Sequence, residues 1–254
     1  MLDVPRGVVR TAHFDPTSHH VVGASWEGTA RVWDATSPYR RWSSPPVATD
    51  CGFATSLEPD RRFIAIGCRD RNTRVWDTAR DQLLAELPSV TPVAGDFASA
   101  FPAVSAAGDR AAIARGDTVE VYELPIRRLV QVVRHGAPVN AVAFAPAGHD
   151  LVSGATDGSL LVTRDGREPI ALPASTGGID TVGFLVDGRA VASDAHGRLR
   201  IYEPDRAAVI ADLELPARVR LLRPSPDGLR LVTIPSYTGK VVPPLLWDFK
   251  RGCA

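Results

Sequence analysis

The chain has 254 residues, of which 44% are hydrophobic and 23% charged, a composition that indicates a folded globular protein rather than a disordered or fibrous one. Lysine plus arginine and aspartate plus glutamate both number 29, so no net charge favours nonspecific binding to nucleic acid or to an anionic membrane. No apolar run approaches the ~20 residues of a membrane span, and the N-terminus lacks a secretory signal pattern, so we expect a cytoplasmic location.

A repeated pattern runs along the chain: a turn, an apolar run, a second tight turn and an aromatic residue followed by an acidic one. Six copies occupy the segments 14–34, 57–77, 104–123, 144–164, 184–203 and 224–248. Their closing pairs lie 39 to 46 residues apart, a period typical of repeat architectures. These pairs are Trp33-Asp34, Trp76-Asp77, Tyr122-Glu123, the degenerate Thr163-Arg164, Tyr202-Glu203 and Trp247-Asp248.

Each copy is predicted to form short antiparallel strands, because its runs of Val, Ile, Leu and aromatic residues are bounded by Gly, Pro, Asp and Ser. In the fourth copy the expected strands are 139–144, 151–155, 160–163 and 169–172. A four-stranded sheet of ~40 residues cannot bury both faces alone, so successive sheets must pack radially. The sequence therefore predicts an all-β propeller of six four-stranded blades, forming a single domain over residues 1–254.

The RVWD endings of the first two copies resemble the WD-repeat propeller family, and the resemblance covers nearly all of residues 8–249. In that family a His, a Ser or Thr, an Asp and the Trp form a hydrogen-bonded tetrad within each blade. The resemblance assigns His135 to the family's His and both Asp70 and Asp157 to its Asp, whereas Glu27 and His196 replace that Asp in two copies. The high ratio of arginine to lysine suggests a bacterial origin.

The last blade is expected to lack its outer strand, because only six residues follow Asp248. An open sheet edge favours pairing with another chain. Three interpretations stay open: a fragment of a longer protein that contains a seventh blade, a closing strand from a partner or from self-association, and brief pairing by residues 2–4.

No arrangement of residues predicts catalysis, a cofactor or a metal site. His13, Asp15, His19 and His20 are close in sequence, but the alignment divides them between a strand and a turn, so they need not converge on a metal. The tripeptide at 115–117 and the Asp-Gly pairs at 157, 187 and 227 are predicted to be turns, where glycine is favoured. The three cysteines, Cys51, Cys68 and Cys253, are expected to be free thiols.

The resemblance places the turns between second and third strands, with the links between blades, on one rim, hereafter the link rim, where partners of the family usually dock. We therefore expect a non-catalytic scaffold that binds proteins or peptides and neither nucleic acid nor membranes. Alternatives are a regulatory or sensor module of a larger bacterial kinase or NTPase, and a propeller hydrolase. Trp, Tyr and Arg are enriched at interface hot spots. The predicted partner-binding residues are Trp26, Glu27, Arg69, Arg71, Arg115, His196 and Tyr237.

Overall fold

The computed structural model describes residues 9–14, 20–25, 30–34, 51–57, 63–68, 72–77, 79–80, 82–88, 102–165, 167–224, 230–235 and 245–248. Within these ranges the regular elements are 22 β-strands and one short 3-10 helix, Pro204–Arg206. No helix in these ranges is long and apolar enough to cross a membrane. The all-β class predicted from the repeats is confirmed.

The strands form six antiparallel sheets, each built from consecutive segments of the chain, and we number them as blades in chain order. Blade 1 contains β1 (Val9–Phe14), β2 (His20–Ser25) and β3 (Ala30–Asp34), and blade 2 contains β4 (Cys51–Leu57), β5 (Phe63–Cys68), β6 (Asn72–Asp77) and β7 (Gln82–Pro88). Blade 3 contains β8 (Ala103–Val104), β9 (Arg110–Arg115), β10 (Thr118–Glu123) and β11 (Arg128–Arg134).

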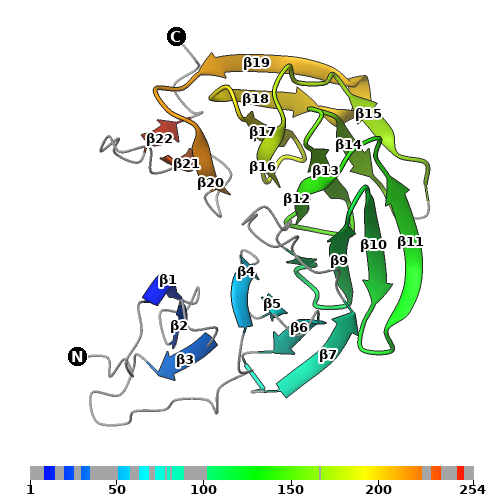
Figure 1. The fold of residues 1–254 in the computed structure, drawn as a ribbon, viewed down its shortest axis with the longest axis vertical. Helices are drawn as coiled ribbons and strands as arrows, with labels where there is room; N and C mark the ends of the chain where they lie inside the picture. The colour runs from blue at the N-terminus through cyan, green and yellow to red at the C-terminus, as the bar shows by residue number, and fades with distance from the viewer. Residues whose placement is uncertain are drawn as a thin grey trace.

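Blade 4 contains β12 (Val139–Phe144), β13 (Leu151–Ala155), β14 (Leu160–Thr163) and β15 (Ile170–Leu172). Blade 5 contains β16 (Ile179–Phe184), β17 (Ala190–Asp194), β18 (Arg198–Glu203) and β19 (Ala208–Glu214), and blade 6 contains β20 (Val219–Pro224), β21 (Arg230–Pro235) and β22 (Leu245–Asp248). The blades follow one another around a common centre, with first strands inside and fourth strands outside (Figure 1).

Four sheets have the four strands predicted for a blade, and the first and last have three strands within the described ranges. In blade 4 the first three predicted strands agree with β12, β13 and β14 residue for residue, and the fourth begins one residue later than expected. The fourth strand expected for blade 1, and the residues that follow Asp248 in blade 6, lie outside the described ranges.

The hydrophobic core is divided among the spaces between neighbouring blades. Between blades 3 and 4, for example, Val119 and Val121 of β10 pack with Val142 and Phe144 of β12. Similar clusters join blades 2 to 3, 4 to 5 and 5 to 6. Every residue of β13 and of β17 is buried, as expected for strands covered on both faces. Burial of each large aliphatic side chain contributes ~1.5–3 kcal/mol, so packing between blades stabilises the fold.

Two bulges recur from blade to blade. In the first strands of blades 4 and 5 the register shifts at Asn140 and at Asp180. In the fourth strands an extra residue is inserted opposite the closing aromatic: Leu84 in β7, Val130 in β11 and Ile210 in β19. A bulge interrupts the ladder and turns the strand, which limits the length of outer edge that can pair regularly with another strand.

The register of blade 2 places Cys51 opposite Cys68 on neighbouring strands. Their separation in sequence gave no sign of this proximity.

Candidate functional site

The link rim is described for blades 3 to 5. It consists of the turns at 115–118, 156–159 and 195–197 and of the links at 135–138, 173–178 and 215–218. Main-chain hydrogen bonds join the turns of blades 4 and 5 to the links on either side and the turn of blade 3 to the link that follows it, so the rim of these blades is a continuous bonded series. The bonds along it run from Val139 N to Gly116 O (2.7 Å), Thr156 N to Pro138 O (2.9 Å), Ser175 N to Gly158 O (2.9 Å), Ala195 N to Gly178 O (2.8 Å) and Leu215 N to Gly197 O (2.8 Å).

Glycine allows the turn and the link of blade 4 to approach so closely. Gly158 has a φ of +86°, and a Cβ built on it would lie 2.2 Å from the carbonyl oxygen of Ser175. A Cβ on Gly178 would lie 2.6 Å from the carbonyl oxygen of Thr156. A side chain at either position would separate the two segments. The predicted turns at 115–117, 157–158 and 187–188 are confirmed, with positive φ at each glycine.

Blade 4 retains part of the family's tetrad beneath the rim. His135 is buried, and its ring nitrogens contact two hydroxyls: Nε2 lies 2.8 Å from Ser153 Oγ and Nδ1 lies 3.0 Å from Ser159 Oγ. Burial is the largest influence and lowers the pKa of His135, while the carboxylates of Asp157 and Asp117 partly offset it. The predicted position of His135 is confirmed, and its hydrogen bonds connect the link before blade 4 to strand β13.

Blade 5 replaces this arrangement with a carboxylate that the sequence alignment missed. Ser175, which occupies the place of His135, donates its hydroxyl to Asp194 Oδ2, and both residues are buried. The other oxygen, Asp194 Oδ1, accepts hydrogen bonds of 2.9 Å from the main-chain N–H groups of His196 and Arg198. Asp194 therefore organises the turn from the end of β17. The sequence signal was an acidic residue at the end of a largely apolar strand.

The contacts of Ser175 also bear on the hydrolase alternative. A serine nucleophile needs its hydroxyl directed at a base such as histidine. Here the hydroxyl is directed at Asp194, and His196 Nδ1 lies 3.5 Å from a different hydroxyl, Thr176 Oγ1. This arrangement is suited to holding a turn.

Two tryptophans that close blades differ in their hydrogen bonding. In blade 6 Trp247 Nε1 donates to Thr233 Oγ1 over 3.2 Å, as the family tetrad implies. In blade 2 the equivalent of Thr233 is Ile66, and the buried Nε1 of Trp76 has no hydrogen-bond partner in the described part of the chain. The tetrad has therefore diverged separately in each blade.

The first-strand bulges provide polar contacts between blades. Asn140 donates its side-chain amide to the carbonyl oxygen of Ile179 in blade 5, at 3.0 Å. Asp180 receives a bidentate interaction from Arg218 of the next link, with both N to O distances at 2.5 Å. The hydrogen bond to Asp180 is the main influence that raises the pKa of Arg218. These contacts fix adjacent blades next to the link rim.

Two of the seven predicted partner-binding residues lie in described segments, and the structure brings their turns to the same rim. His196 is exposed, with its ring over the main chain of Gly177. Arg115 forms an ion pair of 2.8 Å with Glu120 and donates a hydrogen bond to the carbonyl oxygen of Pro88 in blade 2. Its guanidinium is therefore fixed by contacts with other residues of the same chain. The other five, Trp26, Glu27, Arg69, Arg71 and Tyr237, lie outside the described residues.

Glu120 also accepts a hydrogen bond of 2.5 Å from the Tyr122 hydroxyl. Burial, followed by this bond, raises the pKa of Tyr122 to about 12. Arg115 and Tyr122 therefore share one carboxylate on the flank of blade 3.

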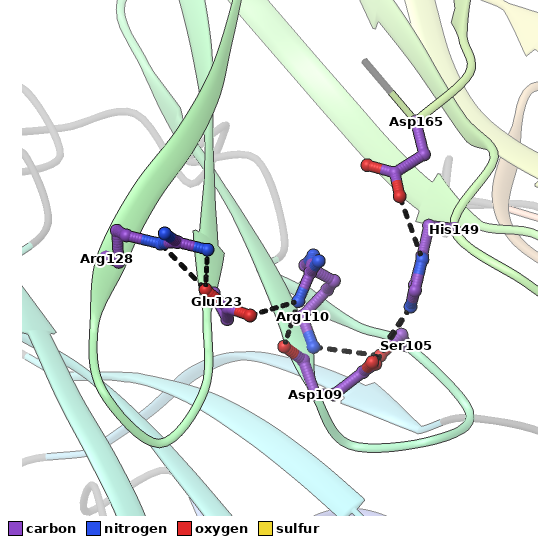
Figure 2. A network of polar contacts seen from close by, with 7 residues as sticks. All are labelled: Ser105, Asp109, Arg110, Glu123, Arg128, His149 and Asp165. Atoms are coloured by element: carbon purple, nitrogen blue, oxygen red, sulfur yellow. Dashed lines mark hydrogen bonds and ion pairs between the residues drawn. The ribbon is translucent and has the colours of Figure 1, made fainter.

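The opposite rim carries a polar network between blades 3 and 4 (Figure 2). His149 Nε2 lies 3.0 Å from both carboxylate oxygens of Asp109, and Nδ1 lies 3.4 Å from Asp165. Burial tends to raise the pKa of Asp109, but hydrogen bonds from Ser105 and His149 outweigh it, and the pKa is lowered. The two carboxylates face different ring nitrogens, so they cannot bind one metal ion together with His149.

The four potential metal ligands near the N-terminus lie only partly in the described segments. His13 lies within β1, as expected, and His20 begins β2 instead of belonging to the preceding turn. Asp15 and His19 lie outside the described residues, and the described part of the chain contains no group of three metal-ligating side chains.

Comparison with known proteins identifies repeats in the same segments of the chain that form blades. The family described as WD domain, G-beta repeat, matches residues 4–34, 48–77 and 127–163. The chain is 34% identical over 110 residues to cilia- and flagella-associated protein 43 of Chlamydomonas reinhardtii, which is 38% of this chain and 6% of that protein. It is 26% identical over 164 residues to nuclear distribution protein nudF of Aspergillus niger, which is 57% of this chain and 36% of that protein.

A third relative, periodic tryptophan protein 2 of Arabidopsis thaliana, is 26% identical over 204 residues, which is 75% of this chain and 21% of that protein. The chain thus spans about a third or less of the length of these relatives. The repeat matches coincide with blades 1 and 2 and with the segment from the outer strand of blade 3 to the close of blade 4. The matched segments, the antiparallel blades and the remnants of the tetrad together show that this chain contains WD repeats.

Proposed function

We propose that this chain is a non-catalytic scaffold that binds protein or peptide partners through its link rim. WD repeats generally mediate protein–protein interactions. The observation that supports this surface is the continuous series of main-chain hydrogen bonds from blade 3 to the start of blade 6. A surface that is ordered before binding avoids much of the entropic cost of ordering loops on association.

The rim residues proposed to contact a partner are the seven predicted from the sequence, among which His196 is the exposed one in the described part of the rim. Arg115 would contribute by keeping the turn at 115–118 against blade 2 through its bonds to Glu120 and Pro88. The exposed neighbour Asp117 is available for direct contact.

The test is affinity measurement with a partner identified by capture on the wild-type chain. Replacing Trp26, Arg71 or His196 with Ala is expected to reduce binding by ~1–3 kcal/mol with little change in thermal stability, because such residues contribute contact energy. The control is Arg206→Ala on the opposite rim, an exposed residue whose ion pair with Glu203 spans 3.2 Å. If Arg206→Ala weakens binding while the three rim variants do not, the partner uses the other rim.

A further inference from the structure

The outer strands of blades 2 and 5 neutralise the arginines of the strands beside them. Two residues before the closing aromatic, the third strands carry Arg74 and Arg200, and the outer strands place Glu86 and Asp212 directly opposite. The resulting ion pairs measure 3.0 Å in blade 2 and 3.1 Å in blade 5. In each of these two blades, this arginine of the third strand is therefore paired with a carboxylate of the outer strand of the same blade.

Blade 3 lacks this arrangement. Its third strand carries Glu120 at the corresponding position, and that carboxylate is already used by Arg115 and Tyr122. Opposite Glu120 the outer strand carries Val132, which is 41% exposed. Two residues further on, where β19 has Glu214, β11 has the exposed Arg134. The outer strand of blade 3 thus has an aliphatic residue where blades 2 and 5 have a carboxylate, and a cation where blade 5 has a second carboxylate.

More aliphatic surface is exposed on this strand and its preceding turn than on the other outer strands described. The exposed fractions are 64% for Ile126, 47% for Leu129 and 37% for Val130, whereas β7 has one such residue, Leu83, and β19 has two, Val209 and Ile210. We call the surface made by Ile126, Leu129, Val130, Val132 and Arg134 the blade-3 wall.

Cations lie at both ends of the wall. Arg127, in the turn before β11, and Arg134, at its end, are exposed, and neither forms an ion pair with a described residue. Arg127 donates one hydrogen bond, of 3.5 Å, to the carbonyl oxygen of Glu86. Arg128 is different, since it is paired with Glu123 at 2.5 Å. Two uncompensated positive charges therefore flank the aliphatic side chains.

We propose that the blade-3 wall is a second docking surface, which takes an extended protein segment of alternating acidic and aliphatic residues. β11 is the terminal strand of its sheet and is hydrogen-bonded to β10 alone, so its outer edge can accept another strand. The bulge at Val130 limits regular pairing to Gln131–Arg134. Aliphatic side chains of the segment cover Leu129 and Val132, and its carboxylates pair with Arg134 and Arg127.

The experiment is selection of random displayed peptides on the whole chain, followed by fluorescence anisotropy with the enriched peptides. The variant Val132→Asp/Arg134→Glu gives blade 3 the acidic pattern of β19. We expect enriched peptides that alternate aliphatic residues with Asp or Glu, and that bind this variant at least about tenfold more weakly. Hydrogen exchange should show protection of β11 when such a peptide binds. Ile210→Asp, at the equivalent bulge of blade 5, should change the affinity less than about twofold.

Arg134→Ser gives a second test if the double variant does not fold, because it removes one exposed cation and keeps the aliphatic packing. A loss of about threefold or more with this variant supports the proposal. The proposal is overturned if no enriched peptide distinguishes the variants from wild type, or if the peptides that do so are neutral or basic. It is also overturned if phosphatidylserine vesicles or single-stranded RNA bind through the wall and the acidic peptides do not.

Discussion

Burial of His135 makes the folded chain less stable in acid. The pKa of this buried residue is lowered, so the unfolded chain binds a proton more readily than the folded chain does. Stability is therefore expected to fall as the pH drops below ~6.5, the unperturbed value, with a contribution of at most ~1.4 kcal/mol per pH unit. Urea unfolding at pH 5, 6 and 7 measures this change in the free energy of unfolding. His135→Gln should be less stable at pH 7 and should lose this part of the pH dependence, whereas His196→Gln should retain it.

The Nε1 of Trp76, which has no hydrogen-bond partner among the described residues, allows a second prediction at this scale. Replacing buried Ile66 with Val should cost ~0.5–1.5 kcal/mol. Thr has the shape of Val, and in an ordinary core its buried hydroxyl would cost a further ~1–3 kcal/mol. At position 66, however, the threonine hydroxyl would lie where the equivalent Thr233 hydroxyl lies in blade 6, and it could accept a hydrogen bond from Trp76 Nε1. We therefore expect Ile66→Thr to be at least as stable as Ile66→Val in urea denaturation. A Thr variant clearly less stable than the Val variant would mean that the indole is not available.

At the scale of the element, strands were easier to predict than the contacts between them. The strands of blade 4 could be located because apolar runs such as 151–155 are bounded by turn residues. The role of Asp194 could not be foreseen, because it aligns with Ala155 at the end of the second strand, whereas the family's Asp position in the turn is occupied by His196 in blade 5. The backbone pairing of Cys51 with Cys68 depends on strand register, which composition does not encode.

The candidate site was predictable to a similar degree. Turns such as Gly116-Asp117 and Asp157-Gly158 could be located because positive φ has a local sequence signal, but their place on one rim came from the family resemblance. The bonds that join those turns to the links are between main-chain atoms, and the side-chain sequence carries no direct record of them. Arg115 shows the consequence: its position on the rim was predictable, but its bonds to Glu120 and Pro88 come from strand pairing and blade packing.

Substitutions at two glycines with nearly the same φ can separate the cost of backbone strain from the cost of disturbing the contact between turn and link. Gly158 and Gly188 have φ values of +86° and +87°, but a Cβ on Gly188 meets nothing within 4 Å. Gly188→Ala should therefore cost ~1–2 kcal/mol, the strain of positive φ alone. Gly158→Ala should cost more, by at least ~1 kcal/mol, because the new Cβ collides with the link at Ser175. Thermal unfolding of both variants measures the difference, and equal losses would mean that turn and link separate at little cost.

At the scale of the whole molecule, the described hydrophobic clusters lie between blades, so each blade is stabilised chiefly by its neighbours. Polar contacts follow the same division, with Asn140 joining blades 4 and 5 and Asp180 joining blades 5 and 6. Stability in such an array is approximately a sum of blade and interface contributions. The link rim and the blade-3 wall are thus surfaces of a structure whose rigidity comes from the interfaces between blades.

This organisation predicts how a core defect spreads. Leu199 of β18 is fully buried in the cluster between blades 5 and 6, and Leu199→Ala should reduce the free energy of unfolding by ~2–5 kcal/mol. Because the cavity weakens one interface, native-state hydrogen exchange should accelerate first in β16 to β22, while β9 to β14 keep most of their protection. The matched variant Val121→Ala, in the cluster between blades 3 and 4, should shift the loss of protection toward β8 to β15. If both variants accelerate exchange uniformly along the chain, the blades unfold as one unit, and the additive description by interfaces does not apply.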